Sequence, residues 1–304
     1  MRESMTAGVA IELAGVTRRF GKQVAVDDLS LQIPAGTTFG FIGPNGAGKS
    51  TTIKMVMGLL PMTAGKITVL GIDAGADPQA VAPRVGYVPE QQFIYRWMRV
   101  GQVIRFCRAF YPTWNNGLCE DLRDRFELPS DKRVKHLSRG MGAKLSLLLA
   151  LSHEPDLLVL DEPTSGLDPI VREEFLDGVL QTVCQHARTV LFSSHTLADV
   201  QRLADTLGLI YGGKLLAYCP VEELLSGTKR IRATLQDGRL PNRPPDGTIC
   251  QRLQRRDWTL TVANFTPQIV EMIRSTNPVQ HVEVMDLGLE DIFKDYVKGR
   301  RATT

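Results

Sequence analysis

The sequence contains a glycine-rich loop, Gly43-Pro44-Asn45-Gly46-Ala47-Gly48-Lys49-Ser50, which is followed by a second hydroxyl residue, Thr51. Residues 38–42 before it form an apolar run typical of a buried parallel strand, and residues 51–58 are typical of a helix that ends at a glycine. Such a loop lets backbone N–H groups and the helix dipole face a polyphosphate. We therefore expect residues 43–51 to bind nucleotide phosphates. Lys49 would neutralise the β- and γ-phosphates, and Ser50 would hold Mg²⁺. The alternative, a flexible connector with an incidental lysine, does not explain eight matched positions in this context.

The composition suits a globular protein and excludes several classes. The chain has 304 residues, of which 43% are hydrophobic, enough for a main domain and a smaller second one. Its net charge of +3, with 23% charged residues of both signs, does not suit a protein that mainly binds nucleic acid. The five cysteines have no spacing typical of zinc or redox sites, which favours reduced thiols in the cytosol. The longest apolar stretch, around residues 145–151, is far shorter than the ~20 residues of a membrane-spanning helix. Any membrane crossing would therefore need another chain.

Two acidic residues end a second apolar strand. Residues 157–160 are all apolar and are followed by Asp161 and Glu162. A continuous apolar run indicates a strand covered on both faces, whose carboxyl end delivers its acids into the ligand crevice. We expect Asp161 to complete the Mg²⁺ site with Ser50, and Glu162 to take a proton from an attacking water.

Polar residues also follow two other predicted strands. The strand at residues 189–193 leads to His195, which could hydrogen-bond a γ-phosphate or the attacking water. The strand at residues 85–89 leads to Glu90 and Gln91, which could bind the nucleotide or a metal-bound water, with Glu90 as a further candidate Mg²⁺ ligand. A solvated loop is the alternative for these two residues.

A second anion site is expected at Ser138-Arg139-Gly140-Met141. Ser138 stands where a helix N-cap is expected, before a helical run at residues 142–152, and Gly140 would allow a phosphate to approach the helix N-terminus closely. The turn-rich loop at residues 163–169, which contains Asp168, follows the acidic strand.

Aromatic residues give two further hypotheses. Phe20 lies in a stretch read as a basic turn at residues 17–22, between strands expected at 9–13 and 29–33. Its ring could stack on an adenine or pack in the core. Seven aromatics lie between Phe93 and Trp114 in an expected helical insertion. They could form the insertion's own core, with a partly exposed groove for a partner helix.

Together these motifs resemble the ATPase subunit of an ATP-binding-cassette (ABC) transporter, from about Ile11 to Gly213. The resemblance rests on the phosphate loop, Leu137-Ser138-Arg139-Gly140-Met141, Asp161-Glu162, Ser165-Gly166-Leu167-Asp168 and His195, in the family's order. Arg139, Met141 and the ending Leu287-Gly288-Leu289-Glu290-Asp291-Ile292-Phe293 are similar to bacterial exporters with separate ATPase and membrane polypeptides.

The resemblance implies a P-loop NTPase fold of ABC type: a mostly parallel core sheet, an antiparallel β cap and a helical insertion. It implies hydrolysis of ATP with Mg²⁺ and a head-to-tail dimer, with itself or a homologous subunit, in which the phosphate loop faces the partner's Ser138 and Gly140. Phe20 would stack on adenine, and Asp168 would bind at the nucleotide site. Glu90 or Gln91 would link the site to an integral membrane permease, with this chain peripheral at the cytoplasmic face of the inner or plasma membrane.

We expect an ATP-binding domain at residues 1–219, with a helical part at about 92–152, and a small α/β accessory domain at residues 220–304 that helps to hold the dimer together. The first alternative function is a non-transport ABC ATPase that acts on a soluble or ribosomal partner. Such proteins usually carry two cassettes or a long coiled coil, and this sequence has neither. The second is a scaffold that binds ATP without useful hydrolysis, against which Lys49, Asp161, Glu162 and His195 argue.

Overall fold

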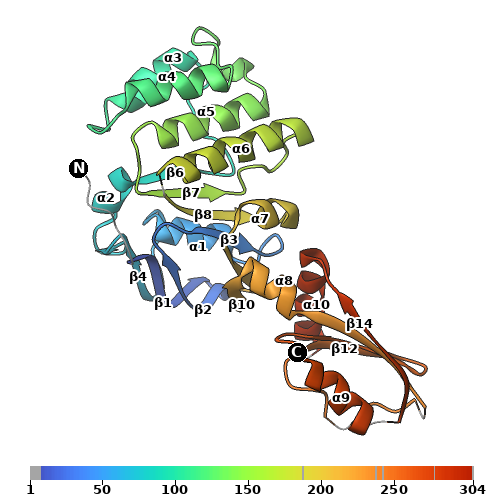
Figure 1. Ribbon diagram of the computed structural model, residues 1–304. Helices are drawn as coiled ribbons and strands as arrows, with labels where there is room; N and C mark the ends of the chain where they lie inside the picture. Colours follow the sequence, from blue (N-terminus) through green and yellow to red (C-terminus); the bar gives the residue numbers. More distant parts are fainter. Residues whose placement is uncertain (1–7, 187, 237, 242, 277, 303–304) are drawn as a thin grey trace. The chain divides into compact units, whose positions relative to one another are not determined.

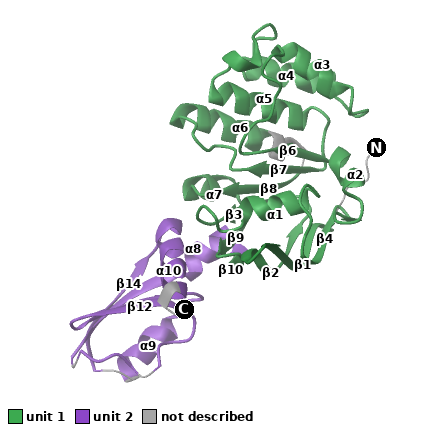
Figure 2. Ribbon diagram, turned by 180° about the vertical axis from the view of Figure 1, so that it is seen from behind, with its two compact units in different colours: residues 1–218 green, residues 219–304 purple. Residues whose placement is uncertain are grey.

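The apolar runs of the sequence form the central strands of a six-stranded sheet in the order β10-β9-β3-β8-β7-β6 (Figure 1). The computed structural model describes residues 8–186, 188–236, 238–241, 243–276 and 278–302. It divides into two compact units, residues 1–218 and 219–304 (Figure 2), with β10 running across the boundary. Residues 1–7 of the expected first domain lie outside the described residues.

Unit 1 contains three groups of elements: the six-stranded sheet with its helices, an antiparallel sheet in the order β2-β1-β4-β5, and a helical insertion. The elements are β1 (Val9–Phe20), β2 (Gln23–Pro34), β3 (Thr38–Ile42), α1 (Lys49–Val56), β4 (Ala64–Val69), β5 (Ile72–Asp73), α2 (Pro78–Val81), η1 (Ala82–Arg84), β6 (Val85–Val88), α3 (Val100–Arg108), α4 (Asn116–Arg125), η2 (Val134–His136), α5 (Arg139–Leu151), β7 (Leu157–Asp161), α6 (Pro169–His186), β8 (Thr189–Ser194), α7 (Leu197–Leu203), β9 (Thr206–Tyr211) and β10 (Lys214–Pro220).

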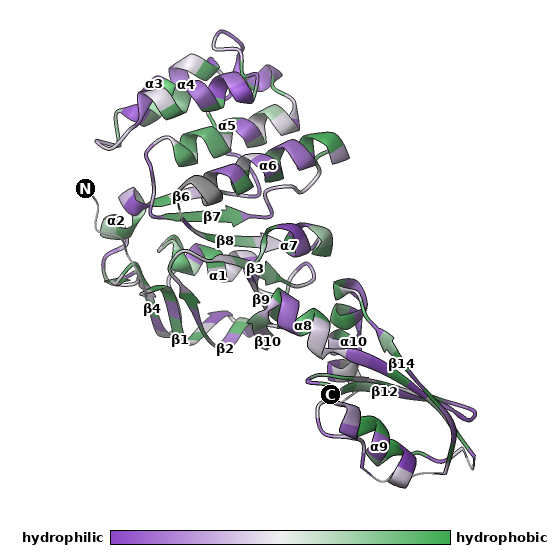
Figure 3. Cartoon of the chain, viewed as in Figure 1, coloured by the Kyte–Doolittle hydropathy of each residue, from purple (hydrophilic) through white to green (hydrophobic). Residues whose placement is uncertain are grey.

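The central strands are apolar because both faces of the sheet are covered. Every residue of β3, β7 and β8 is buried, and Figure 3 shows their strong hydrophobic colouring. Strands β3, β8, β7 and β6 pair in parallel, with Phe41 level with Ser193 and Asp161 level with Ser193. The carboxyl ends of β3, β7 and β8 therefore meet at one edge of the sheet, where ligands bind in open α/β sheets.

Strand β1 is longer than the sequence predicts. The structure extends it from the expected end at Leu13 to Phe20, so the turn shortens to Gly21 and Lys22. Register shifts between Leu13 and Val16, and again between Val16 and Arg19, interrupt the alternation of buried and exposed residues. Bulges of this kind hide a continuous strand from a period-two pattern.

The helical insertion takes its core mainly from aliphatic side chains. Val100, Val103 and Leu122 are buried there, together with Phe126 and Leu128. By contrast, five of the seven clustered aromatics are exposed: Phe93, Tyr95, Trp97, Phe106 and Phe110. The interpretation of these five as the insertion's own core is therefore wrong. Four of them contact one another instead. The ring centroid of Tyr95 lies 6.1 Å from that of Trp97 and 5.8 Å from that of Phe106, and the centroids of Phe106 and Phe110 are 5.1 Å apart. We call these five residues the aromatic surface.

Unit 2 is a four-stranded antiparallel sheet in the order β12-β13-β11-β14, with helices. Its elements are α8 (Val221–Gly227), β11 (Lys229–Leu235), β12 (Thr248–Gln254), β13 (Asp257–Val262), α9 (Pro267–Thr276), β14 (Val279–Asp286) and α10 (Leu289–Ala302). The sequence did not reveal β12, whose residues are all exposed or only partly buried. The core of unit 2 forms around the fully buried Trp258, together with Ile231, Leu260 and Ile273. The fold class expected from the sequence, an ABC-type α/β domain followed by a small α/β domain, is confirmed.

Candidate functional site

The glycine-rich loop joins β3 to α1, as the sequence predicts, and its glycines are required by the backbone. Gly48 has φ +110°, and a Cβ there would lie 2.5 Å from the carbonyl oxygen of Ala25. A side chain at Gly43 would collide with the backbone of Ile210. An L-residue at either position would force the loop open. The loop therefore keeps its backbone close to the neighbouring strands and directs the first turn of α1 toward the strand ends.

Lys49 opens α1 and is almost fully buried, with 5% of its side chain exposed. Its ammonium donates to the carbonyl oxygens of Gly43 at 2.7 Å and Pro44 at 3.3 Å. It also lies 2.9 Å from Oε1 of Glu162. Since a buried ammonium needs partners for its charge, these contacts hold it inside the loop at the head of the helix.

Ser50 and Asp161 contact each other across the site. The Ser50 hydroxyl donates to Oδ1 of Asp161 at 2.9 Å, and the buried Ser193 hydroxyl donates to the same oxygen at 2.8 Å. The Asp161 charge also acts on Tyr87 of the neighbouring strand β6. Burial and, to a smaller extent, this charge raise the pKa of Tyr87 to about 12. A hydroxyl and a carboxylate are hard oxygen donors of the kind that Mg²⁺ uses when phosphates and waters supply its other ligands. The residues present therefore fit a Mg²⁺ ion. Among the described residues there is no cluster of three or more Asp, Glu, His or Cys able to hold a metal by itself.

Glu162 is held at the centre of this group by its backbone and its neighbours. Its φ of +47° is uncommon for a residue with a side chain and costs on the order of 1 kcal/mol or more. Its N–H donates to the Ser193 hydroxyl at 2.9 Å. Its side chain is 7% exposed, and Oε2 lies 2.7 Å from Nδ1 of His195. The strained backbone therefore directs the carboxylate between the Lys49 ammonium and the His195 ring.

Ser193 was missed as a site residue by the sequence analysis. Its hydroxyl bridges the two acids, because it accepts from Glu162 N and donates to Asp161. The available signal was a hydroxyl residue at the end of an otherwise apolar strand. Its pairing with Asp161 depends on β8 lying between β3 and β7, which strand order in the sequence does not reveal.

A second missed group lies just behind the site. Asp199 of α7 is 3% exposed and accepts hydrogen bonds from the Thr164 hydroxyl and from Arg172, both at 2.7 Å. Thr164 belongs to the loop after Glu162, and α7 begins two residues after His195. This buried network therefore ties together the segments that follow the two residues.

The other residues expected at the site are not joined to it. Among the described residues, no hydrogen bond or ion pair connects the Lys49–Asp161–Glu162–His195 group to Phe20, Glu90, Gln91, Ser138, Gly140 or Asp168. Phe20 is 46% exposed, and the Arg18 guanidinium lies 4.5 Å from its ring centroid, so it is not a core residue. Glu90 and Gln91 are exposed on the loop after β6.

The stretch around Ser138 forms a distinct helix start. The N-cap prediction is confirmed, since the Ser138 hydroxyl accepts from Met141 N at 3.2 Å at the beginning of α5. Gly140 has an additional reason to be glycine: a side chain there would collide with Val171 of α6. A cavity of about 260 Å³ opens beside Ser138, and Arg96, Lys135 and Arg139 line it. This helix start is therefore bordered by positive charge.

Comparison with known proteins decides the family. The model of the family described as "ABC transporter" matches residues 26–165. The chain is 37% identical over 303 residues to the Nod factor export ATP-binding protein I of Sinorhizobium fredii (strain NBRC 101917 / NGR234), covering 94% of this chain and 85% of that protein. The chain belongs to the ABC transporter family. As an ABC ATPase, it is the ATP-binding type of subunit that the sequence indicated.

Further relatives extend this finding. The linearmycin resistance ATP-binding protein LnrL of Bacillus subtilis (strain 168) is 30% identical over 293 residues, 92% of this chain and 84% of that protein. A solved ATP-binding subunit of an ABC transporter superposes with a TM-score of 0.65 at 26% identity, covering 71% of this chain and 92% of that one. In the described part of this ABC ATPase, no helix has the length and apolarity needed to cross a bilayer.

Proposed function

We propose that this ABC ATPase powers export through a separate membrane subunit, by binding ATP, closing as a head-to-tail dimer, hydrolysing the ATP and reopening. The observation that carries the proposal is the position of the Glu162 carboxylate, 2.9 Å from Lys49 Nζ and 2.7 Å from His195 Nδ1. The names of two relatives, a Nod factor exporter and a linearmycin resistance protein, support the direction of transport.

In this proposal the phosphates of ATP lie along residues 43–51, where loop N–H groups and the start of α1 receive their charge. Lys49 exchanges contacts with the loop carbonyls and Glu162 for contacts with the β- and γ-phosphates. Ser50 and Asp161 would hold Mg²⁺, with Glu90 as a further candidate ligand, and the bound ion would supply positive charge next to the phosphates. Phe20 stacks on the adenine, which its exposure supports.

Hydrolysis would then be a matter of positioning and charge. Glu162 orients the attacking water and takes a proton from it. His195 holds the carboxylate through its ring and backbone N–H, contacts that support a positioning function. Ser138 and Gly140 of the partner subunit, at the start of its α5, would face the γ-phosphate, and Asp168 would lie at the same interface. ATP thus binds the closed dimer more tightly than the open subunits, because two subunits contact it there, and this difference couples nucleotide to movement.

The aromatic surface supports the existence of a membrane partner. Phe93 is 85% exposed and Trp97 is 66% exposed, and the rings of Tyr95, Trp97, Phe106 and Phe110 form a connected group. Exposed apolar residues gathered in this way are typical of a binding surface. We assign this surface to a helix of the permease, with Glu90 or Gln91 connecting it to the nucleotide site. The ABC ATPase would then be peripheral, at the cytoplasmic face of the inner or plasma membrane.

The test is purification of the full chain from native membranes in mild detergent, with identification of the proteins that co-purify. An integral membrane protein with several spans is expected, and a Phe93→Ser/Trp97→Ser variant should recover much less of it while hydrolysing ATP at the basal rate. Arg105→Ser, an exposed change on α3, is the matched control. Recovery of ribosomes or soluble proteins alone would overturn the transport proposal and favour the non-transport alternative.

A further inference from the structure

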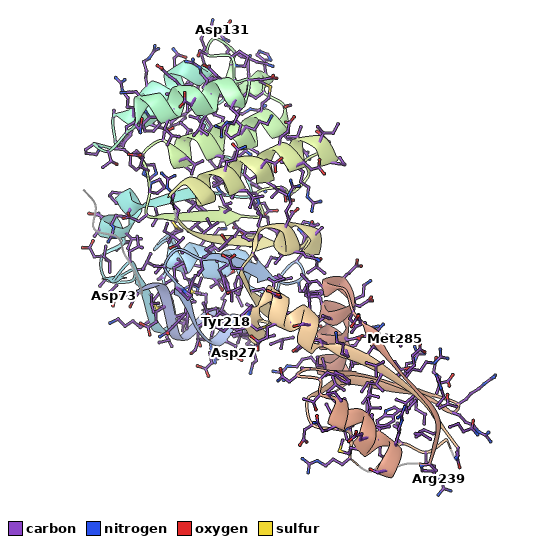
Figure 4. All side chains as sticks on the ribbon, viewed as in Figure 1. Asp27, Asp73, Asp131, Tyr218, Arg239 and Met285 are labelled. Atoms are coloured by element: carbon purple, nitrogen blue, oxygen red, sulfur yellow. The ribbon has the colours of Figure 1, made fainter. Side chains whose placement is uncertain are left out.

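Strand β14 (Val279–Asp286) is an open edge of unit 2. The sheet order is β12-β13-β11-β14, so β14 pairs with β11 on one side and with no other strand of the described chain on the other. Five of its eight residues are exposed: Gln280, His281, Glu283, Val284 and Asp286. Figures 1 and 2 show β14 along the border of its sheet, and Met285, labelled in Figure 4, marks its position. An edge of this kind presents a row of backbone donors and acceptors to any strand that pairs with it.

This edge has few of the devices that usually prevent pairing. Natural edge strands carry Lys, Pro or bulges, whereas residues 279–286 contain neither Lys nor Pro, and their one register shift against β11 lies near the start of the strand, between Val279 and His281. The pairing with β11 is regular from Asp286 back to His281. Val284 is 41% exposed, an apolar side chain on an unprotected edge. The opposite edge differs, because α10 packs so closely on β12 that a side chain at Gly299 would collide with the backbone of Ile249. Of the two edge strands in the described part of unit 2, β14 is therefore the more open to pairing.

We infer that two copies of this chain pair edge to edge through β14, antiparallel, about a two-fold axis at Val282. In this register His281 of each copy lies opposite Glu283 of the other, and an imidazole N–H can donate to a carboxylate. The two His281–Glu283 pairs lie on the same face of the sheet. On β11, His281 is opposite Thr234 and Glu283 is opposite Arg232, and residues two apart in a strand point to the same face. Cross-strand pairs of this kind stabilise antiparallel sheets.

The apolar residues fit the same axis. Val282 packs against the core of unit 2, and the two-fold axis sets it against its own copy, so the core continues from one sheet into the next. If the two-fold axis is moved by one residue from Val282, the His281–Glu283 and Val282–Val282 pairs are lost. An axis at Glu283 sets two carboxylates opposite each other, and an axis at His281 sets each Glu283 opposite Val279. Self-complementarity therefore favours a second copy of this chain over an unrelated strand.

This contact goes beyond the ATP-driven closure proposed above, because it does not involve the nucleotide. A short strand pair is weak alone, but it raises the effective concentration of the two attached ATPase units for each other. Its purpose would be to keep two subunits together when nucleotide has left.

Sedimentation velocity of the full chain without nucleotide tests the inference, on a Lys49→Ala background that removes ATP-driven association. The mass is expected to rise with protein concentration from 33.6 kDa toward the dimer value. Glu283→Lys and His281→Glu should each raise the dissociation constant about tenfold, since each disrupts two symmetry-related pairs. The His281→Glu/Glu283→Lys double variant, which restores opposite charges, should recover most of the affinity.

Glu271→Lys makes the same charge change on the exposed surface of α9 and serves as the control, with circular dichroism to verify folding. A wild-type chain that stays monomeric at every concentration would overturn the inference. So would Glu283→Lys associating as tightly as Glu271→Lys. Neither outcome affects the ATPase proposal, which rests on different residues.

Discussion

Nδ1 of His195 lies 2.7 Å from Oε2 of Glu162, and the backbone N–H of His195 donates to the same oxygen at 3.2 Å. Two contacts from one residue fix the orientation of the carboxylate, while Lys49 occupies its other oxygen. Glu162 and His195 directly follow the neighbouring strands β7 and β8, so the pairing of these strands brings the two residues together. This fixed orientation supports the proposed role of Glu162 as the general base.

Glu162→Gln is expected to reduce ATP turnover at least about 100-fold, because an amide cannot accept the proton. It has nearly the same shape, so nucleotide binding and ATP-driven dimerisation should persist. Phosphate release and size-exclusion chromatography with ATP measure the two properties. An inactive variant that stays monomeric with ATP would contradict the assignment of a base and indicate a binding defect.

Phe20→Ala is expected to weaken nucleotide affinity by about tenfold, since stacking on a base contributes roughly 1–3 kcal/mol. Turnover at saturating ATP should change little, because the ring does not touch the phosphates. Titration with a fluorescent ATP analogue measures the affinity, and Phe110→Ala on the aromatic surface is the matched control. Equal affinities of Phe20→Ala and the control would remove the stacking assignment.

How much of this site the sequence could predict depends on how local the signal is. The loop at residues 43–50, the N-cap at Ser138 and the apolar strands are encoded within a few residues, and the structure confirms these local elements. The bridge made by Ser193 could not be predicted, because it depends on which strands become neighbours. The same is true of the network around Asp199, whose partners Thr164 and Arg172 are 35 and 27 residues away in the chain.

Two predictions from the sequence, the burial of the insertion's aromatic residues and the length of β1, were wrong because they too depend on contacts between distant residues. The aromatic residues of the insertion were expected to form its core with a partly exposed groove. Within α3 the buried positions are Val100 and Val103, so Phe106 on the same helix is left exposed. Strand β1 was cut short because its bulges break the alternation. In both cases a tertiary contact, absent from any local pattern, determined the result.

Asp199→Ala is expected to destabilise unit 1 by about 3 kcal/mol, because it leaves the Arg172 guanidinium and the Thr164 hydroxyl without their shared partner. Asp199 is 3% exposed while Arg172 is 27% exposed, so part of the arginine charge remains solvated and a larger effect is not expected. Urea unfolding measures the loss. An Arg172→Met/Asp199→Leu double variant, which removes both charges, should lose less, and a double variant as unstable as Asp199→Ala would contradict the buried-charge explanation.

His153 should make the stability of unit 1 dependent on pH. Its ring is stacked on Tyr111, with centroids 4.0 Å apart, and only 2% of the residue is exposed. Burial, and then the charge of Arg188, lower its pKa from 6.5 to about 4. The neutral ring is thus favoured in the folded state, whereas the unfolded chain takes up a proton below pH 6.5. The stabilisation is fully present above pH 6.5 and decreases as the pH falls toward 4.

The expected loss between pH 7.5 and pH 4.5 is about 2 kcal/mol for this one residue. His153→Gln removes the titrating group, so its free energy of unfolding should fall less over the same interval, although the variant starts from a lower stability at pH 7.5. Urea unfolding of both proteins at the two pH values gives the change in the free energy of unfolding with pH for each. The difference between these two changes isolates His153, because the titration of all other groups is common to both proteins. Parallel pH dependences would show that His153 is not held neutral by the fold.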